Sequence, residues 1–426
     1  MIGHTTDRQV EQAYTNAKEI YAGFGVATDK VLKTMKNIPI SLHCWQGDDV
    51  TGLEVNAKGL KGDGIQATGN YPGRARNGDE LRQDIVKAMS LIPGKLRLNL
   101  HAFYCETEGK FVDRDALESK HFARWIDWAK NYKIALDFNG TFFSHPNVVG
   151  GLTLASPERA IREFWIRHGQ ICRHIAADIA HELGQRCVND IWIPDGFKDL
   201  PADRWLYRQY LKESLDAILA EPIDRTLVKD AVESKLFGIG SEAYVVGSHE
   251  FYLAYAVKNN IALCLDSGHF HPTEKVSDKI SAILTFIAEL LLHITRGIRW
   301  DSDHVVNFDD ETRDIFLEIV RGDALDRVSI ALDFFDASIN RIAAWVIGTR
   351  AAQKALLYAL LEPTALLKKY ELAGDFTARL ALMEDLKTMP FGAVYNYFCL
   401  QSGKSPGFSW MDEIKTYEKE VLAKRN

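Results

Sequence analysis

Eight short apolar runs recur along this chain, and each is separated from the next by a stretch long enough to hold a helix. The runs are ISLHCW (40–45), LRLNLHAFY (96–104), KIALDFN (133–139), DIWIPDG (190–196), KDAVESKLF (229–237), IALCLDSGH (261–269), ELLLHIT (289–295) and RVSIALDFF (327–335). Buried strands that alternate with helices form a parallel sheet covered by those helices. The fold class predicted is therefore α/β, a (β/α)8 TIM barrel.

The chain is longer than such a barrel needs. Its 426 residues exceed the about 250 of a minimal barrel. Residues 7–36 predict an N-terminal helix that closes the bottom of the barrel, and 338–361 and 364–426 are mostly helical in pattern. We divide the chain into the barrel with its N-terminal helix (1–361) and a C-terminal helical extension (362–426), which we expect to serve oligomerisation.

Composition excludes several classes of protein. The net charge is -7 and no long Lys/Arg run occurs, so neither a nucleic-acid partner nor an anionic membrane partner is expected. No apolar run approaches the roughly 18 residues of a membrane span. The six cysteines are scattered and form no CxxC pair, which favours reduced thiols in a cytoplasmic protein.

The phase of two predicted strands shows where their side chains point. Ala262, Cys264 and Asp266 alternate with large aliphatic residues, and the run ending at Asp333 repeats this pattern. Because successive side chains of a strand face opposite ways, the small residues and the final carboxylate should face inward. Both carboxylates then lie at the C-terminal mouth, where barrel enzymes carry their active sites.

Further carboxylates and imidazoles follow the ends of the predicted strands. They are Glu233, Asp266, His269, His271, His293, Asp301, Asp303, His304, Asp333 and Asp336, with Lys235 beside Glu233. Oxygen and nitrogen ligands without cysteine suit hard or borderline divalent cations. Six carboxylates cannot all stay ionised in one pocket unless cations offset their repulsion. One cation carries only two charges, so two are predicted.

Other features at the same mouth suggest a substrate pocket. Trp192 and other aromatic residues near strand ends could wall a sugar site or simply pack the core. His101, two residues after Asn99, could reach the substrate. The long Gly-rich segment 47–80 after the first strand is a candidate active-site lid.

Several long motifs resemble those of L-rhamnose isomerases. They are HCWQGDDV (43–50), GIQATGNYPG (64–73), WIPDG (192–196), ESKLFGIG (233–240), LDSGHFHPTE (265–274), RWDSDHVV (299–306) and LDFFDASINRIAAWVIGTR (332–350). The resemblance covers essentially the whole chain. It implies a homotetrameric, usually manganese-dependent barrel enzyme that interconverts L-rhamnose and L-rhamnulose.

The resemblance also implies roles for individual residues. One metal site corresponds to Glu233, Asp266, His293 and Asp333, and a second, catalytic one to His269, Asp301 and Asp303. Positions around the sugar or the active site correspond to His101, Trp192, Lys235 and Asp326. The same ligands would also accept zinc, cobalt or magnesium.

The chemistry of an aldose–ketose isomerase requires a hydrogen to move between C1 and C2. No nicotinamide fingerprint is present, so the hydrogen moves within the substrate, by a direct hydride shift or through an enediol. Two metals favour the hydride shift, because one can anchor O2 while the other polarises O1. Asp301 or Asp303 would hold a water that shuttles the proton, and Lys235 would steady charge at O1.

Two alternatives stay open at this level. A metal-dependent barrel phosphoesterase or nuclease can use similar ligands, although it should show a basic groove. An isomerase that acts mainly on another aldose is the second, since an apolar pocket rejects an added hydroxyl only weakly, on the order of 10²-fold.

Overall fold

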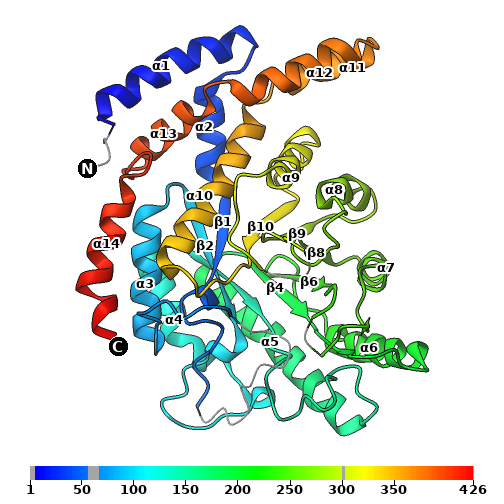
Figure 1. Cartoon of the computed structure of the whole chain (residues 1–426). Coiled ribbons are helices and arrows are strands. Elements are labelled where there is room, and N and C mark those ends of the chain that lie inside the picture. The colour runs from blue at the N-terminus through cyan, green and yellow to red at the C-terminus, as the bar shows by residue number, and fades with distance from the viewer. Residues whose placement is uncertain (1–4, 56–66, 239, 300–302, 426) are drawn as a thin grey trace.

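A closed barrel of parallel strands forms the centre of the molecule (Figure 1). The computed structural model describes residues 5–55, 67–238, 240–299 and 303–425. Within those ranges, eight strands close in the order β1-β10-β9-β8-β6-β4-β3-β2. They are β1 (Pro39–His43), β2 (Lys95–His101), β3 (Ala135–Asn139), β4 (Cys187–Trp192), β6 (Val228–Glu233), β8 (Ala262–Asp266), β9 (Leu290–Ile294) and β10 (Val328–Leu332). The predicted (β/α)8 barrel is confirmed.

The eight apolar runs each overlap one barrel strand, but β4 begins three residues earlier than predicted. Polar Asn189 separates Cys187 and Val188 from the predicted run, which starts at Asp190. Asn189 is nevertheless buried, and its amide donates to Asp230 at 2.9 Å. A two-stranded antiparallel sheet of β5 (Gly196–Phe197) and β7 (Tyr244–Val245) was not expected. Strands of two residues leave no periodic pattern in a sequence.

The predicted phase of β8 and β10 is also observed. Ala262, Cys264 and Ala331 belong to a small cluster inside the barrel, together with Val188, Ala231 and Leu291. Their aliphatic neighbours, such as Leu263 and Leu332, belong to the much larger cluster between the strands and the helices. Asp266 ends β8 and Asp333 directly follows β10. Both carboxylates therefore leave the barrel at its C-terminal mouth.

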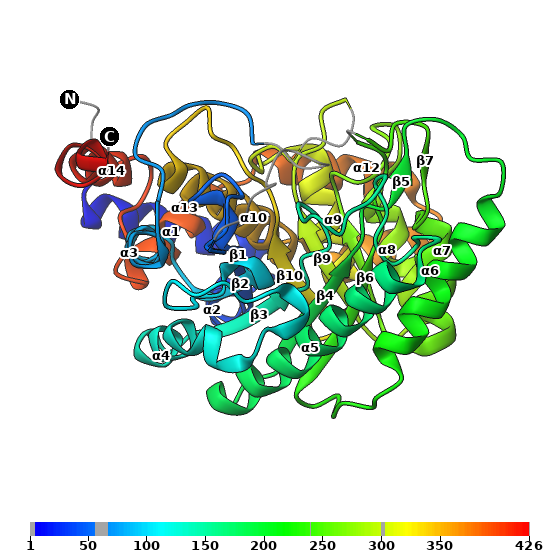
Figure 2. The ribbon, with the colours of Figure 1, turned by 90° about the horizontal axis from the view of Figure 1, so that it is seen from below.

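Helices surround the barrel and pack on its aliphatic outer face (Figure 2). They are α3 (Gly78–Leu91), α4 (Ala123–Tyr132), α5 (Arg159–Leu183), α6 (Arg204–Leu219), α7 (His249–Asn259), α8 (Val276–Leu284), α9 (Asp310–Arg321) and α10 (Arg341–Leu360). Aspartate or asparagine caps several of their first turns, as Asn77 does for α3 and Asp309 does for α9. Such caps satisfy amides that lack a partner within the helix.

The N-terminal region forms two helices where one was expected, α1 (Asp7–Gly23) and α2 (Thr28–Asn37). Gly25 separates them with a left-handed backbone (φ 77°), a conformation that costs glycine little. Only α2 approaches the bottom of the barrel, where Thr34 and Asn37 line a cavity. Helix α1 instead packs on the C-terminal extension, with Tyr14 stacked on Tyr397 at 3.9 Å between ring centroids.

The C-terminal extension is helical, as expected. It consists of α11 (Thr364–Leu372), α12 (Phe376–Asp385), α13 (Phe391–Gln401) and α14 (Trp410–Glu420). Residues of α1, α2, the end of α10, α11 and α13 share one hydrophobic cluster, and Figure 1 shows α1 lying along α13. The boundary predicted at 361/362 thus crosses a continuous apolar contact, and a division there stays a prediction.

The bottom of the barrel is closed by charged pairs. Arg97 donates to both carboxylate oxygens of Asp137, at 2.6 and 2.9 Å. Lys229 lies 2.6 Å from Glu289. These groups line a cavity of about 490 Å³ that also includes Asp326. Among the described residues, no helix has both the length and the apolar character that crossing a membrane requires.

Candidate metal centre

Four side chains from neighbouring strands converge at the C-terminal mouth. Glu233 ends β6, Asp266 ends β8, His293 lies in β9 and Asp333 follows β10. One ligand atom from each lies within 4.8 Å of the others. His293 Nδ1 is 2.9 Å from a Glu233 oxygen and 3.4 Å from an Asp333 oxygen. The first predicted ligand set is therefore brought together by the fold.

A second group shares Asp266 with the first. Asp266, His269 and Asp303 also place ligand atoms within 4.8 Å of one another. His269 Nδ1 lies 2.8 Å from the carbonyl oxygen of Ser234. Because a carbonyl can only accept, Nδ1 carries a proton, so the neutral ring offers its lone pair at Nε2. Metal-binding histidines are commonly oriented in this way. Asp301, predicted for this group, lies outside the described residues.

The polar atoms of these groups fit a cation. Asp266 Oδ2 and His293 Nε2 are buried and have no hydrogen-bond partner within the described parts of the chain. A buried polar atom without a partner costs about 1–3 kcal/mol. A divalent cation among these oxygens and nitrogens would remove that cost and offset the repulsion of the carboxylates. The two groups can therefore hold metal ions.

The pKa values of the cluster reflect the burial of its groups and the charges beside them. Burial opposes the charge of Glu233, yet His293 and His269 hold the pKa of this carboxyl well below its usual range. Burial also opposes the charge of His293, but Cys264, Glu233 and Asp333 raise its pKa. Burial raises the pKa of Asp266 to about 7. Protons therefore stabilise the cluster when no metal is bound, and metal binding would release them.

Sequence reasoning missed Asp190, which lies directly behind the cluster. It shares a third group of ligand-type side chains with Glu233, Cys264 and His293. Burial and then Glu233 raise its pKa well above the usual range. The alternation of β4 could have identified it, since Asp190 and Trp192 share the inward face once the strand begins at Cys187.

Aromatic side chains and a lysine lie beside the metal-ligating groups. The ammonium of Lys235 is 5.1 Å from the Trp192 ring centroid, and the rings of Trp192 and His269 stack at 6.1 Å. Phe143 contacts both Trp192 (5.6 Å) and His101 (5.5 Å). Burial lowers the pKa of His101 to about 3, so this imidazole is neutral. Three of the four predicted sugar-binding residues thus surround one space.

The fourth predicted sugar-binding residue, Asp326, lies elsewhere. It precedes β10, whereas Asp333 follows that strand. Asp326 therefore lies at the N-terminal end of the barrel, where it lines the bottom cavity. Within one chain, the barrel core separates it from the metal-ligating groups.

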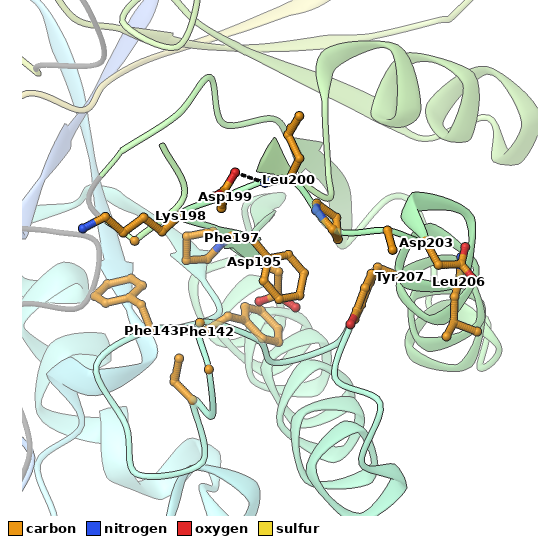
Figure 3. A pocket seen from close by; sticks show the side chains of 17 residues that line it. Phe142, Phe143, Asp195, Phe197, Lys198, Asp199, Leu200, Asp203, Leu206 and Tyr207 are labelled. Carbon is orange, nitrogen blue, oxygen red and sulfur yellow. Dashed lines mark hydrogen bonds between the residues drawn. The ribbon is translucent and has the colours of Figure 1, made fainter. Parts of the chain in front are cut away.

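A second cavity adjoins the aromatic wall of the site, by which we mean Trp192, Phe143 and His101 (Figure 3). Its volume is about 840 Å³, and its lining includes Phe142, Phe143, Phe197, Leu200, Leu206 and Tyr207. Asp195 also lines it and accepts hydrogen bonds from the amides of Thr153 and Ala155 at 2.9 and 2.8 Å. Phe143 is shared between this cavity and the aromatic wall.

Comparison with known proteins shows the family of this chain. A solved D-allulose 3-epimerase from a Methylomonas species superposes with a TM-score of 0.45 and 13% identity, covering 75% of this chain and 96% of that one. The profile of the L-rhamnose isomerase (RhaA) family matches residues 8–425. The L-rhamnose isomerases of Rhodopirellula baltica and Listeria innocua are 56% and 54% identical over 98% of this chain, and 97% and 99% of their own lengths. The chain belongs to the L-rhamnose isomerase family.

Family membership decides between the alternatives left by the sequence. An L-rhamnose isomerase is an aldose–ketose isomerase, so the phosphoesterase or nuclease alternative is rejected. The acid and histidine groups around Asp266 could hold metal ions. The motifs that carried the resemblance end the strands that build this centre.

Proposed function

We propose that this chain interconverts L-rhamnose and L-rhamnulose with two divalent cations, manganese by preference. The observation that carries the proposal is the pair of acid and histidine groups that share Asp266 at the barrel mouth. One cation would be held by Glu233, Asp266, His293 and Asp333. The other would be held by His269 and Asp303, together with Asp301. Identity above 50% to L-rhamnose isomerases over nearly the full length supports the substrate.

The reaction moves a hydrogen from C2 to C1 of the open-chain sugar. When bound, the cations supply Lewis acidity and positive charge to the sugar oxygens. The ammonium of Lys235 stabilises the negative charge that develops on O1. Asp303, with Asp301, accepts the hydroxyl proton from O2 through a water and returns it at O1. His101, neutral and buried, offers a hydrogen bond to a sugar hydroxyl, and Trp192 covers an apolar face of the sugar chain.

Ketose formation from L-rhamnose tests the activity directly. The protein should lose activity in EDTA and recover it with manganese. No ketose under either condition would reject the proposed function. A comparison of kcat/KM for L-rhamnose with that for L-mannose decides whether another aldose is the main substrate.

Deuterium at C2 distinguishes the two routes of hydrogen transfer. A direct hydride shift keeps the label in the ketose at C1, whereas an enediol exchanges it with solvent. We expect retention, measured by mass spectrometry of the product. Complete loss of the label to water would establish the enediol route.

We further propose a cytoplasmic homotetramer. Its support is the outer face of the C-terminal extension, where Leu372, Phe376 and Leu380 are 90%, 57% and 63% exposed. Large apolar side chains grouped in this way commonly mark an interface between subunits. All six cysteines are buried free thiols, which suits a reducing compartment.

A further inference from the structure

Arg114 is an almost completely buried arginine that joins three loops at the barrel mouth. It begins η3 (Arg114–Ala116) on the segment after β2 and is 1% exposed. Its Nε and Nη2 donate to the two carboxylate oxygens of Glu54, at 2.8 and 2.9 Å. The remaining donors reach the segment after β3, at the carbonyl oxygens of Thr141 (2.9 Å), Phe143 (2.5 Å) and Ser144 (3.2 Å).

The segment held by Arg114 has an unfavourable backbone conformation. Ser144 has a φ of 52°, in the left-handed region that non-glycine residues seldom adopt. Such a conformation persists only when the surroundings enforce it. A second contact adds to the restraint: the amide of Thr141 donates to His168 Nε2, while His168 Nδ1 donates to the carbonyl oxygen of Arg114, both at 3.0 Å. The turn over 141–144 is therefore held in place from two sides.

This turn sets the position of two side chains of the sugar site. The Phe143 ring lies between Trp192 and His101, 5.6 and 5.5 Å from their centroids. The hydroxyl of Thr141 lies 3.3 Å from His101 Nδ1. That hydrogen bond helps to fix the orientation of the His101 ring. The carbonyl groups of Thr141 and Phe143 accept from Arg114, so a change at Arg114 moves both side chains together.

We propose that Arg114 is a positioning residue for sugar binding, which holds Phe143 and His101 against Trp192. Through its hydrogen bonds to Glu54, it also connects these aromatic side chains to the loop after β1. The proposal rests on the proposed function for its substrate. Among the described residues proposed as metal ligands, none is a hydrogen-bond partner of Arg114. Its loss should therefore weaken sugar binding and leave the chemical step and metal binding largely intact.

The test variant is Arg114→Lys, because lysine keeps the charge and loses the planar fork of donors. A single ammonium cannot bond both oxygens of Glu54 and three carbonyl groups at once. Displacement of a binding group by about 1 Å can cost up to 100-fold. We expect KM for L-rhamnose and its Kd by calorimetry to rise about tenfold, with kcat within about threefold of wild type.

Arg97→Lys is the matched control. Arg97 also pairs with a carboxylate through two hydrogen bonds and donates to the carbonyl oxygen of Arg186 at 2.7 Å. It lies at the opposite end of the barrel, so its replacement should lower stability without changing KM. An equal rise of KM in both variants would overturn the proposal, because general loosening would then explain it.

Hydrogen exchange provides a readout that needs no turnover. The amides of 141–145 should exchange faster in Arg114→Lys, and their exchange should be unchanged in Arg97→Lys. If Arg114→Lys does not fold, Glu54→Gln replaces it and should raise Kd in the same direction. Unchanged Kd and unchanged exchange in a folded variant would overturn the positioning role. A wild-type protein that binds L-rhamnose but forms no ketose would reject the proposed function alone.

Discussion

Among the proposed metal ligands, Asp266 has the largest expected effect, because it belongs to both groups proposed to hold a cation. Asp266→Asn keeps the shape of the side chain and removes its charge. We expect affinity for manganese to fall by at least about 100-fold and ketose formation to fall with it. Manganese titration by calorimetry measures this. Asp278→Asn, an exposed acid on α8, is the control and should bind manganese as wild type does.

The resemblance places Asp326 around the sugar or the active site, but in the fold it lies at the opposite end of the barrel. Its exposed carboxylate lies at the N-terminal end of β10. We expect Asp326→Asn to leave KM for L-rhamnose and kcat within about twofold of wild type, since a distant surface charge is screened by salt. Steady-state kinetics at physiological ionic strength measure both. A large rise in KM would show that this residue reaches a sugar site in the assembled protein.

Asp48 should make the stability depend on pH. It is buried after β1 and accepts hydrogen bonds from Tyr104 Oη (2.6 Å) and Gly52 N (2.8 Å). Burial raises its pKa from 3.8 to about 7. Because the folded value is the higher one, Asp48 binds a proton on folding. Its contribution to stability is therefore complete below about pH 4 and is lost as pH rises through about 7.

The variant Asp48→Asn cannot titrate and isolates this effect. The free energy of unfolding of wild type, relative to the variant, should fall by at most roughly 4 kcal/mol across that range. Urea unfolding at several pH values between 4.5 and 8 measures the difference. A difference that stays constant over this range would contradict the assignment.

At the scale of the elements, the loop before α3 can adopt its conformation because residue 69 is a glycine. Gly69 has a φ of 120°, and a Cβ there would lie 2.2 Å from the carbonyl carbon of Ala337. The same loop bonds the segment after β10 through Tyr71 N and Ala337 O (2.8 Å). We expect Gly69→Ala to destabilise the fold by on the order of 3 kcal/mol, measured by thermal unfolding.

Gly184 offers a matched control for this loop. It too has a left-handed backbone (φ 61°), but a Cβ there would meet no atom within 4 Å. Gly184→Ala should therefore cost only about 1 kcal/mol. Equal losses in the two variants would show that backbone conformation alone matters, without the close approach to Ala337.

Helices and strands could be predicted where the spacing of apolar residues along the sequence is regular. The strands β8 and β10 alternate small and large apolar residues over their length, so both their existence and their phase followed from the sequence. The break at Gly25 was missed because the apolar spacing continues on both sides of it. The paired segments β5 and β7 are too short to carry any period.

At the scale of the whole molecule, the convergence of the candidate metal ligands could be predicted because a closed parallel barrel brings every strand end to one mouth. No further knowledge of packing was needed to predict that four side chains meet there: Glu233, Asp266, His293 and Asp333. The role inferred for Arg114 could not be predicted in this way. Its partners lie on loops after three different strands, and loop conformation is set by contacts that no local pattern records.

The proposed tetramer can be tested on its exposed apolar face. The double variant Leu372→Lys and Leu380→Lys places charge where subunits would meet, and buried unpaired charge is strongly unfavourable. We expect a smaller species by size-exclusion chromatography with light scattering. Val257→Lys on α7, 41% exposed, is the control. An unchanged mass for the double variant would remove this face from the interface.

The contact of α1 with α13 also has a consequence for biosynthesis. Tyr14 leaves the ribosome long before Tyr397, its stacking partner. At about 5–20 residues per second, translation of the intervening chain takes roughly 20–80 s. During that time the face of α1 that packs on α13 lacks this partner, although Tyr14 can already contact Thr28 of α2. A nascent chain of this protein therefore exposes part of an amphipathic helix to chaperones until α13 has been synthesised.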